Sequence, residues 1–333
     1  MSRTSRGSPG ALPSADVAAF AQACTRIASE AADAAGFVPI RSLLERFHAQ
    51  IVVRPLLVEG MLATQPGVQS EWLVLVDSEL YQVTEADFAQ ENASRPLSPR
   101  LRFTVAHELV HSLAFRTSEF GIRLSTIDTE VSRAAVVDAI EGITDSLTPL
   151  LLLPESALAD FFKSGVARTS AHDFAELRAR TGVSRRTLLG RLRALSRADA
   201  NRLSRYSLED IAICIGEWKE KQAVIRASPV FARFARNVLP EFLLRLTNQD
   251  RMPASLAFQD ASFAPSGGIR NNLETVILAG TPGAPDAEKM HVHCSYEEAD
   301  KGSGSEFFLV VRRVPIAQPV SRDSLRSGTD AQL

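Results

Sequence analysis

The sequence predicts an α+β protein in three parts: a helical part with a small sheet over residues 14–165, a helix-turn-helix-like segment over 166–205, and a second α+β part over 206–315. Two observations support this division. The chain of 333 residues is longer than one typical domain. Apolar residues recur mainly at helical spacing up to about residue 200 and then mainly in strand-like runs. Residues 1–13 and 316–333 are polar, without hydrophobic period, and are expected to be disordered tails.

The composition is that of a soluble globular chain. The hydrophobic fraction is 45%, the charged fraction 23% and the net charge −2, which argues against a globally basic nucleic-acid-binding protein. The sequence has neither an apolar run long enough to cross a membrane nor a signal-peptide pattern. Cys24, Cys214 and Cys294 are widely separated, which argues against a disulfide framework or a cysteine zinc site. We therefore expect a cytoplasmic protein without a membrane partner.

Hydrophobic spacing and turn residues predict the elements of the first part in order. They are helices over 14–35 and 39–47, strands over 50–56 and 71–77 separated by a loop with Gly60, a polar loop over 81–99, and helices from 101 and over 129–153. Ser14 and Ser98 can cap helices, and Pro39 and Pro99 are suited to a first helical turn.

Residues 169–196 read as two helices joined by a Thr-Gly-Val-Ser turn, the pattern of a helix-turn-helix. Between residues 166 and 205 lie ten arginines and three acids, a local charge of +7. Arg185 and Arg186 open the second helix, where a DNA reader makes contacts. DNA binding is therefore possible, but a solvated basic face beside the first part is the favoured interpretation.

The third part is predicted from strand-like runs with one helix among them. The runs cover residues 210–215, 223–227, 255–258, 275–278, 290–295 and 307–311, and the helix covers 230–246. Met290-His291-Val292-His293-Cys294 offers three metal-capable side chains, but neighbouring residues on a strand point to opposite faces, so an ordinary strand is the favoured interpretation.

The stretch R-F-T-V-A-H-E-L-V-H, residues 102–111, carries the chemistry. Residues four apart on a helix differ by about 40° and about 6 Å along the axis, so His107 and His111 can converge on one ion. Zinc held by two imidazoles and a carboxylate keeps a position for water, and Glu108 can take the proton of that water. By composition the H-E-x-x-H pattern is expected roughly 0.007 times by chance.

The third ligand should be a carboxylate on a neighbouring element. Glu141 lies on the predicted helix over 129–153, among apolar residues, where an unpaired acid would be costly to bury. One turn further, Asp145 lies on the same helix face and can accept a hydrogen bond from the second ring nitrogen of a ligating histidine. The alternative for Glu141 is a surface carboxylate without a metal. For Asp145, a surface carboxylate and the supporting role are equally favoured.

With residues 102–111 and the segment E-G-I-T-D-S-L-T-P-L-L-L-L-P-E at 141–155, the sequence resembles the ImmA/IrrE family of metallopeptidases. The family pattern is R-F-T-x-A-H-E-x-x-H followed by a glutamate thirteen residues before a proline, and Glu141 precedes Pro154 by that interval. The resemblance covers about residues 15–200. It implies a zincin-like fold with zinc bound by His107, His111 and Glu141. The order of the later segments is similar to the longer IrrE branch, which implies a GAF-like sensor or docking domain over 206–315.

The expected function is therefore that of a zinc-dependent endopeptidase with Glu108 as general base; another divalent metal is possible. The resemblance implies a helix-turn-helix repressor as protein substrate, whose cleavage derepresses stress or mobile-element genes. The alternative is a non-proteolytic DNA- or ligand-binding regulator with a structural or vestigial metal site.

Two further expectations concern the site. Tyr81, Tyr206, Tyr296, His48 and His172 are candidates to stabilise the oxyanion, and the sequence does not choose among them. The edge of the small sheet near residues 71–77 is expected to hold the substrate as an added strand.

Overall fold

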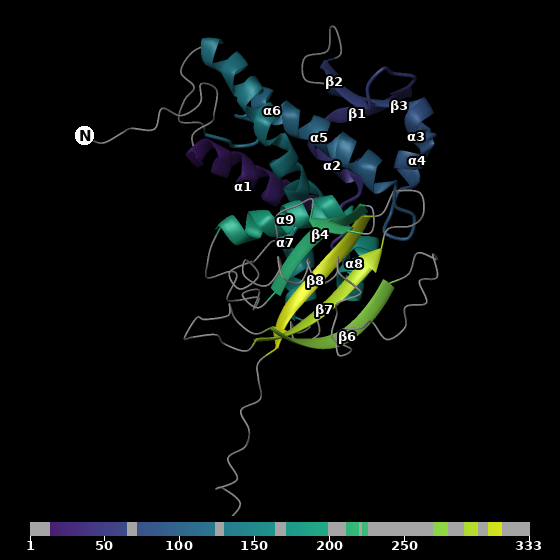
Figure 1. Ribbon diagram of the computed structural model, residues 1–333. Helices are drawn as coiled ribbons and strands as arrows, with labels where there is room; N and C mark the ends of the chain where they lie inside the picture. Colours follow the sequence, from purple (N-terminus) through teal and green to yellow (C-terminus); the bar gives the residue numbers. More distant parts are fainter. Residues whose placement is uncertain are drawn as a thin grey trace, which may run out of the picture.

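A computed structural model of the protein shows an α+β fold (Figure 1). It describes residues 14–64, 72–123, 130–163, 171–198, 211–219, 222–225, 269–278, 290–298 and 306–314. Within these residues lie nine helices, a three-stranded mixed sheet and a five-stranded antiparallel sheet, which confirms the predicted α+β class. None of these helices is long and apolar enough to span a membrane. The expected tails, the helix over 230–246 and the strand over 255–258 lie outside the described residues.

The first part contains seven helices and the small sheet. In chain order the elements are α1 (Ser14–Ala31), α2 (Ile40–Arg46), β1 (Ala49–Arg54), β2 (Gly60–Thr64), β3 (Trp72–Asp77), α3 (Ser78–Tyr81), α4 (Glu85–Gln90), α5 (Pro99–Phe115), α6 (Glu130–Leu152) and α7 (Glu155–Lys163). The predicted start of the motif helix is confirmed: Pro99 begins α5, and the Ser98 hydroxyl accepts a hydrogen bond from the Leu101 N–H.

The structure corrects both loops predicted in this part. The loop expected around Gly60 contains strand β2, and the loop expected over 81–99 contains α4. Strand β2 is short and begins with glycine, which resembles a turn signal. Helix α4 is short and polar and is held by a capping box between Thr84 and Asp87, so it has little hydrophobic period to detect.

The small sheet has the strand order β1-β3-β2, with β3 parallel to β1 and antiparallel to β2. Both edges of β3 are thus paired along residues 72–77. The prediction that a substrate strand adds near residues 71–77 is therefore wrong, because the backbone groups of β3 already bond to its two neighbours. Among the described strands, β2 is the edge that lies beside α5.

Helices α8 (Ala171–Thr181) and α9 (Arg185–Ala198) have the predicted helix-turn-helix pattern. Gly182 turns the chain with a φ of +64°, a conformation in which glycine is not strained. Helix α9 packs against α6, where the Pro149 ring lies 3.0 Å from the position a Gly190 Cβ would take. The Nε of Arg191 donates to the Leu153 carbonyl at 2.8 Å, so this arginine of the basic segment is buried against the end of α6.

The third part is a five-stranded antiparallel sheet with the order β5-β4-β8-β7-β6. Its strands are β4 (Ile211–Lys219), β5 (Gln222–Ile225), β6 (Ile269–Leu278), β7 (Met290–Glu298) and β8 (Glu306–Val314), which match five of the six predicted runs. The sheet contacts α8 and α9 (Figure 1), and the rings of Phe174 and Phe308 lie 5.9 Å apart. One cluster of buried apolar residues continues from α1 to β8 across residues 165 and 205, so the domain boundaries remain predictions.

A buried ion pair connects helix α5 to its neighbours. Arg102 and Glu91 pair with both side chains fully buried. The second carboxylate oxygen of Glu91 accepts from the Ile40 N–H at 2.6 Å, and the Arg102 Nη2 donates to the carbonyls of Val38 at 2.8 Å and Thr181 at 3.4 Å. Burial lowers the pKa of Arg102, and the charge of Glu91 opposes that shift. The segments around α2, α4 and α8 therefore meet at one guanidinium.

We predict that Glu91→Ala lowers the free energy of unfolding by about 3–5 kcal/mol, because it leaves the Arg102 charge buried without its partner. Urea denaturation of the full chain measures this. The control is Glu45→Ala, which breaks an exposed Arg41–Glu45 pair and should cost about 1 kcal/mol or less. Equal costs for the two variants would contradict the assigned role of the buried pair.

Candidate metal site

Helix α5 presents two neighbouring stripes of functional side chains. Arg100, Thr104 and Glu108 recur every fourth residue on the stripe that faces β2: a Cβ on Gly60 would lie 2.6 Å from the Thr104 Cγ2 and 3.6 Å from the Glu108 Cγ. His107 and His111 form the stripe that faces α6. The predicted base and the predicted ligands thus lie side by side, between strand β2 and helix α6.

The structure brings the three predicted ligands together. The ring centroids of His107 and His111 are 4.8 Å apart, and the rings meet at 73°. The Nε2 of His111 lies 2.9 Å from the Oε2 of Glu141 on α6. One donor atom from each of the three residues lies within 4.8 Å of the other two, so the group could hold a metal ion.

Asp145 lies where the sequence predicted a supporting carboxylate. Its Oδ1 is 3.3 Å from the Nδ1 of His107. A proton on that nitrogen would leave the Nε2 lone pair for a metal ion, so this contact selects the ligating nitrogen. The side chain of Asp145 is 84% exposed, which makes it the least enclosed member of the site.

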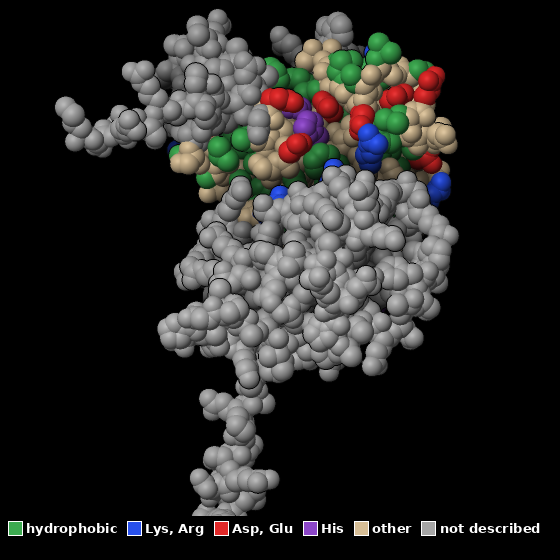
Figure 2. Space-filling model, viewed as in Figure 1, with side chains coloured by type: hydrophobic (Ala, Val, Ile, Leu, Met, Phe, Trp, Pro, Cys, Tyr) green, Lys and Arg blue, Asp and Glu red, His purple; other side chains and the backbone are tan. Residues whose placement is uncertain are grey.

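The burial argument for Glu141 is wrong, although Glu141 does lie beside His111. Its side chain is 65% exposed because it lies on the solvent side of α6, while Ile140 beside it faces the core. The histidines are more enclosed: the side chains of His107 and His111 are 22% and 15% exposed. Figure 2 shows histidine surface among acidic side chains on one face of the molecule. A metal ion at this site would be reachable from solvent.

The electrostatics suit a base beside a neutral His111 imidazole. Burial raises the pKa of Glu108; the charge of His107 and a hydrogen bond from the Leu62 backbone N–H oppose that shift. Burial also lowers the pKa of His111, against the opposing charge of Glu141. A lowered pKa keeps the imidazole neutral and able to donate its lone pair to a metal.

The donor set and its spacing fit zinc. Imidazole nitrogen and carboxylate oxygen are ordinary zinc ligands, and two such ligands about 2.1 Å from a tetrahedral ion are roughly 3.4 Å apart. The separation of 2.9 Å between His111 and Glu141 is close to this value. Because the three donor atoms are grouped within 4.8 Å, ligation requires side-chain movement, for which the exposed Glu141 is suited.

The other sequence candidates do not join this group among the described side chains. The hydroxyl of Tyr81 bonds to Glu59 and Thr104, each at 2.8 Å. His172 pairs with Glu176 on α8 at 3.2 Å, and the exposed His48 has a left-handed φ of 43°. Tyr206 lies outside the described residues. The structure describes the backbone of β7 but not the side chains of Tyr296, His291, His293 and Cys294.

Three residues for which the sequence predicted no role, Glu59, Arg100 and Thr104, join Tyr81 in a polar cluster beside the site. The four-residue recurrence of Arg100, Thr104 and Glu108 was the available signal for the helix side of this cluster. No sequence pattern indicates the pairing of Glu59 with Arg100, because the two residues are 41 positions apart in the chain.

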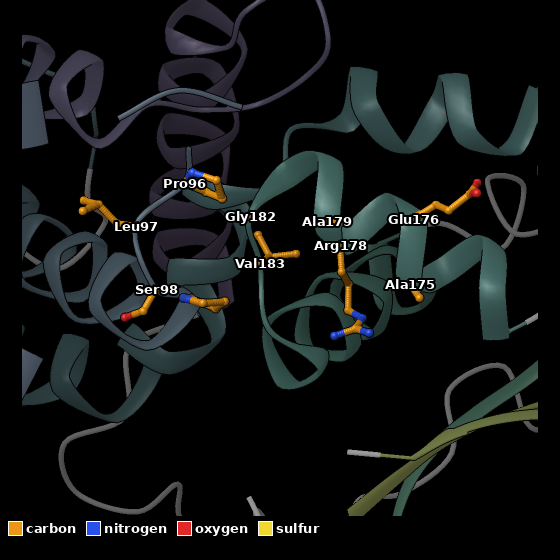
Figure 3. Close-up of a pocket in the computed structure, with 10 residues that line it drawn as sticks. Pro96, Leu97, Ser98, Ala175, Glu176, Arg178, Ala179, Gly182 and Val183 are labelled. Atoms are coloured by element: carbon orange, nitrogen blue, oxygen red, sulfur yellow. The ribbon is translucent and has the colours of Figure 1, made fainter. Parts of the chain in front are cut away.

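A cavity of about 510 Å³ lies elsewhere, between the loop that enters α5 and the helix α8 (Figure 3). Pro96 and Leu97 line one side, and Ala179 and Val183 line the other. None of the predicted ligands borders it, so the cavity contributes no group to the metal site.

A comparison of the chain with models of known protein families gives no match, and a search of curated proteins gives none either. The ImmA/IrrE resemblance therefore rests on the two sequence blocks alone.

We predict that His111→Ala and Glu141→Ala each lower the affinity for Zn²⁺, and that Asp145→Asn lowers it by roughly 10-fold, the small end of the range for supporting carboxylates. Affinity should fall with falling pH as protons compete for the imidazoles. Because the pKa of His111 is lowered, protonation of this imidazole should reduce Zn²⁺ affinity only at pH values below those at which an ordinary histidine titrates.

Competition with a zinc-binding dye measures these affinities. The control is His172→Ala, which removes a histidine paired with a glutamate on α8. Unchanged affinity in His111→Ala would contradict the assigned ligand set.

Proposed function

We propose that the protein is a zinc-dependent endopeptidase with a zincin-like active site, acting in the cytoplasm. The observation that carries this proposal is the grouping of His107, His111 and Glu141 within 4.8 Å, with Glu108 on the adjoining stripe of α5. A purely structural metal site would not require an acid next to the ligands. When bound, zinc would polarise the scissile carbonyl and lower the pKa of water.

Glu108 is the proton carrier in this proposal. Its carboxylate is half-buried and has a raised pKa, so it can accept a proton from the attacking water and pass it to the departing amine. His107, His111 and Glu141 would hold the zinc, while Asp145 keeps the His107 ring oriented.

The proposed substrate is a protein, bound as an extended segment along the edge strand β2. Strand β2 contacts α5 beside Glu108, and an added strand would bond to its outer backbone groups. A helix-turn-helix repressor, whose loss derepresses stress or mobile-element genes, is the substrate that the ImmA/IrrE resemblance suggests. Residues 206–315 would then serve as a GAF-like sensor or docking domain.

The non-proteolytic regulator remains the competing proposal, and DNA binding is its main form. Helix α9, which would be the recognition helix, buries Leu188, Leu192 and Arg191 in the contacts with its neighbours. This packing supports a structural role for α9. Arg186 is exposed at its start, so DNA binding stays a prediction that salt-dependent binding measurements would test.

We predict that Glu108→Gln retains Zn²⁺ but reduces cleavage by roughly 100-fold or more, because the amide cannot accept the proton. Wild type and variant, each loaded with one equivalent of Zn²⁺, are incubated with the repressors encoded beside the gene, and products are read by intact mass. Glu85→Gln, at an exposed glutamate of α4, is the control and should cleave like wild type. No cleavage by wild type, together with salt-sensitive DNA binding that survives His107→Ala, would favour the regulator.

A further inference from the structure

Four polar side chains connect the start of β2 to helix α5: Glu59, Tyr81, Arg100 and Thr104, here called the Glu59 cluster. The Nε of Arg100 donates to the Oε2 of Glu59 at 3.1 Å, and a second guanidinium nitrogen pairs with the other oxygen. The Tyr81 hydroxyl donates to Glu59 at 2.8 Å. A carboxylate only accepts and the tyrosine has one hydroxyl hydrogen, so Thr104 donates to Tyr81.

The Glu59 cluster lies where β2 approaches α5 most closely. Glu59 directly precedes Gly60, the first residue of β2. A Cβ on Gly60 would lie only 2.6 Å from the Cγ2 of Thr104, so the observed separation requires glycine at this position. The same Cβ would lie 3.6 Å from the Cγ of Glu108, which is van der Waals contact distance. The strand and the proposed base are therefore in contact.

The Glu59 cluster adds little to overall stability. The side chains of Arg100 and Glu59 are 66% and 44% exposed, and ion pairs that exposed contribute about 0–1 kcal/mol. Its effect should instead be local, because both ends of the bond chain lie on the elements that flank Glu108. One stripe of α5 carries Arg100, Thr104 and Glu108. A shift of β2 relative to that stripe would therefore alter the contacts between the strand and Glu108.

We propose that the Glu59 cluster and Gly60 position strand β2 on α5, so that the strand stays packed against the stripe that carries Glu108 and presents its outer edge beside this proposed base. Tyr81 is thereby a positioning residue, and its hydroxyl is engaged in holding the strand. The proposal rests on the endopeptidase function for its catalytic consequence, but the placement of β2 can be measured without cleavage.

The test is a compensating pair of substitutions in the full chain. Gly60→Ala should push β2 away from Thr104 and raise amide hydrogen exchange over residues 60–64 by roughly tenfold, as expected when local hydrogen bonds are lost. Thr104→Ser removes the Cγ2 but keeps the hydroxyl that donates to Tyr81. The double variant Gly60→Ala/Thr104→Ser should therefore return exchange to near the wild-type rate. Tyr81→Phe, which removes the donor to Glu59, should also raise exchange over this segment.

Zn²⁺ affinity should stay within roughly threefold of wild type in these variants, because no metal ligand changes. On the repressor that wild type cleaves, kcat should fall in Gly60→Ala with a smaller change in KM, and the double variant should recover it. The control is Arg41→Ala, which breaks the exposed pair with Glu45 on α2 and should change neither exchange over 60–64 nor kcat.

Wild-type exchange rates in both Gly60→Ala and Tyr81→Phe would overturn the proposal, as would raised exchange that Thr104→Ser does not reverse. A loss of Zn²⁺ affinity in the variants with raised exchange would also overturn it, since the structural change would then not be confined to strand β2. If wild type cleaves no repressor, the endopeptidase function fails while the exchange measurements still decide how β2 is placed.

Discussion

The buried ion pair between Arg102 and Glu91 is the interaction on which the rest of the site depends. A guanidinium with no exposed side-chain surface must find its acceptors inside the protein, and here they come from Glu91, Val38 and Thr181. Gly182 makes room for it, because a Cβ there would lie 3.2 Å from the Arg102 Nε. Three segments distant in sequence are thus held around the first half of α5. The second half of the same helix carries His107, Glu108 and His111.

The two sides of helix α5 carry different groups: the histidines face α6, and Glu108 faces β2. On the side of α6, Glu141 and Asp145 meet the histidines from exposed positions, which leaves their carboxylates free to adjust. On the side of β2, a glycine contact fixes the strand closely against the helix. We expect loss of the deep ion pair to reduce global stability, and loss of the exposed Glu59–Arg100 pair to act locally. The proposed base, Glu108, thereby lies between the candidate metal ligands and strand β2.

The sequence predicted what depends on spacing along one element. The histidines and the base share one helix, and Glu141 and Asp145 share another, so periodicity was enough to propose them. Periodicity did not predict contacts between segments distant in the chain, nor did it predict short elements. Strand β2 looked like a turn because glycine starts it, although that glycine is required by the approach to Thr104. The pairing of Glu59 with Arg100 has no periodic signature, and the exposure of Glu141 depends on which face of α6 meets the core.

X-ray absorption at the zinc edge of the full-length, zinc-loaded protein tests the central claim most directly. The account predicts one zinc ion per chain, a nitrogen and oxygen shell at about 2.0–2.2 Å, and the multiple-scattering pattern of two imidazoles. His111→Ala should remove one imidazole from that pattern. A sulfur shell at about 2.3 Å, or a wild-type spectrum that persists in His111→Ala, would place the metal elsewhere and contradict the account.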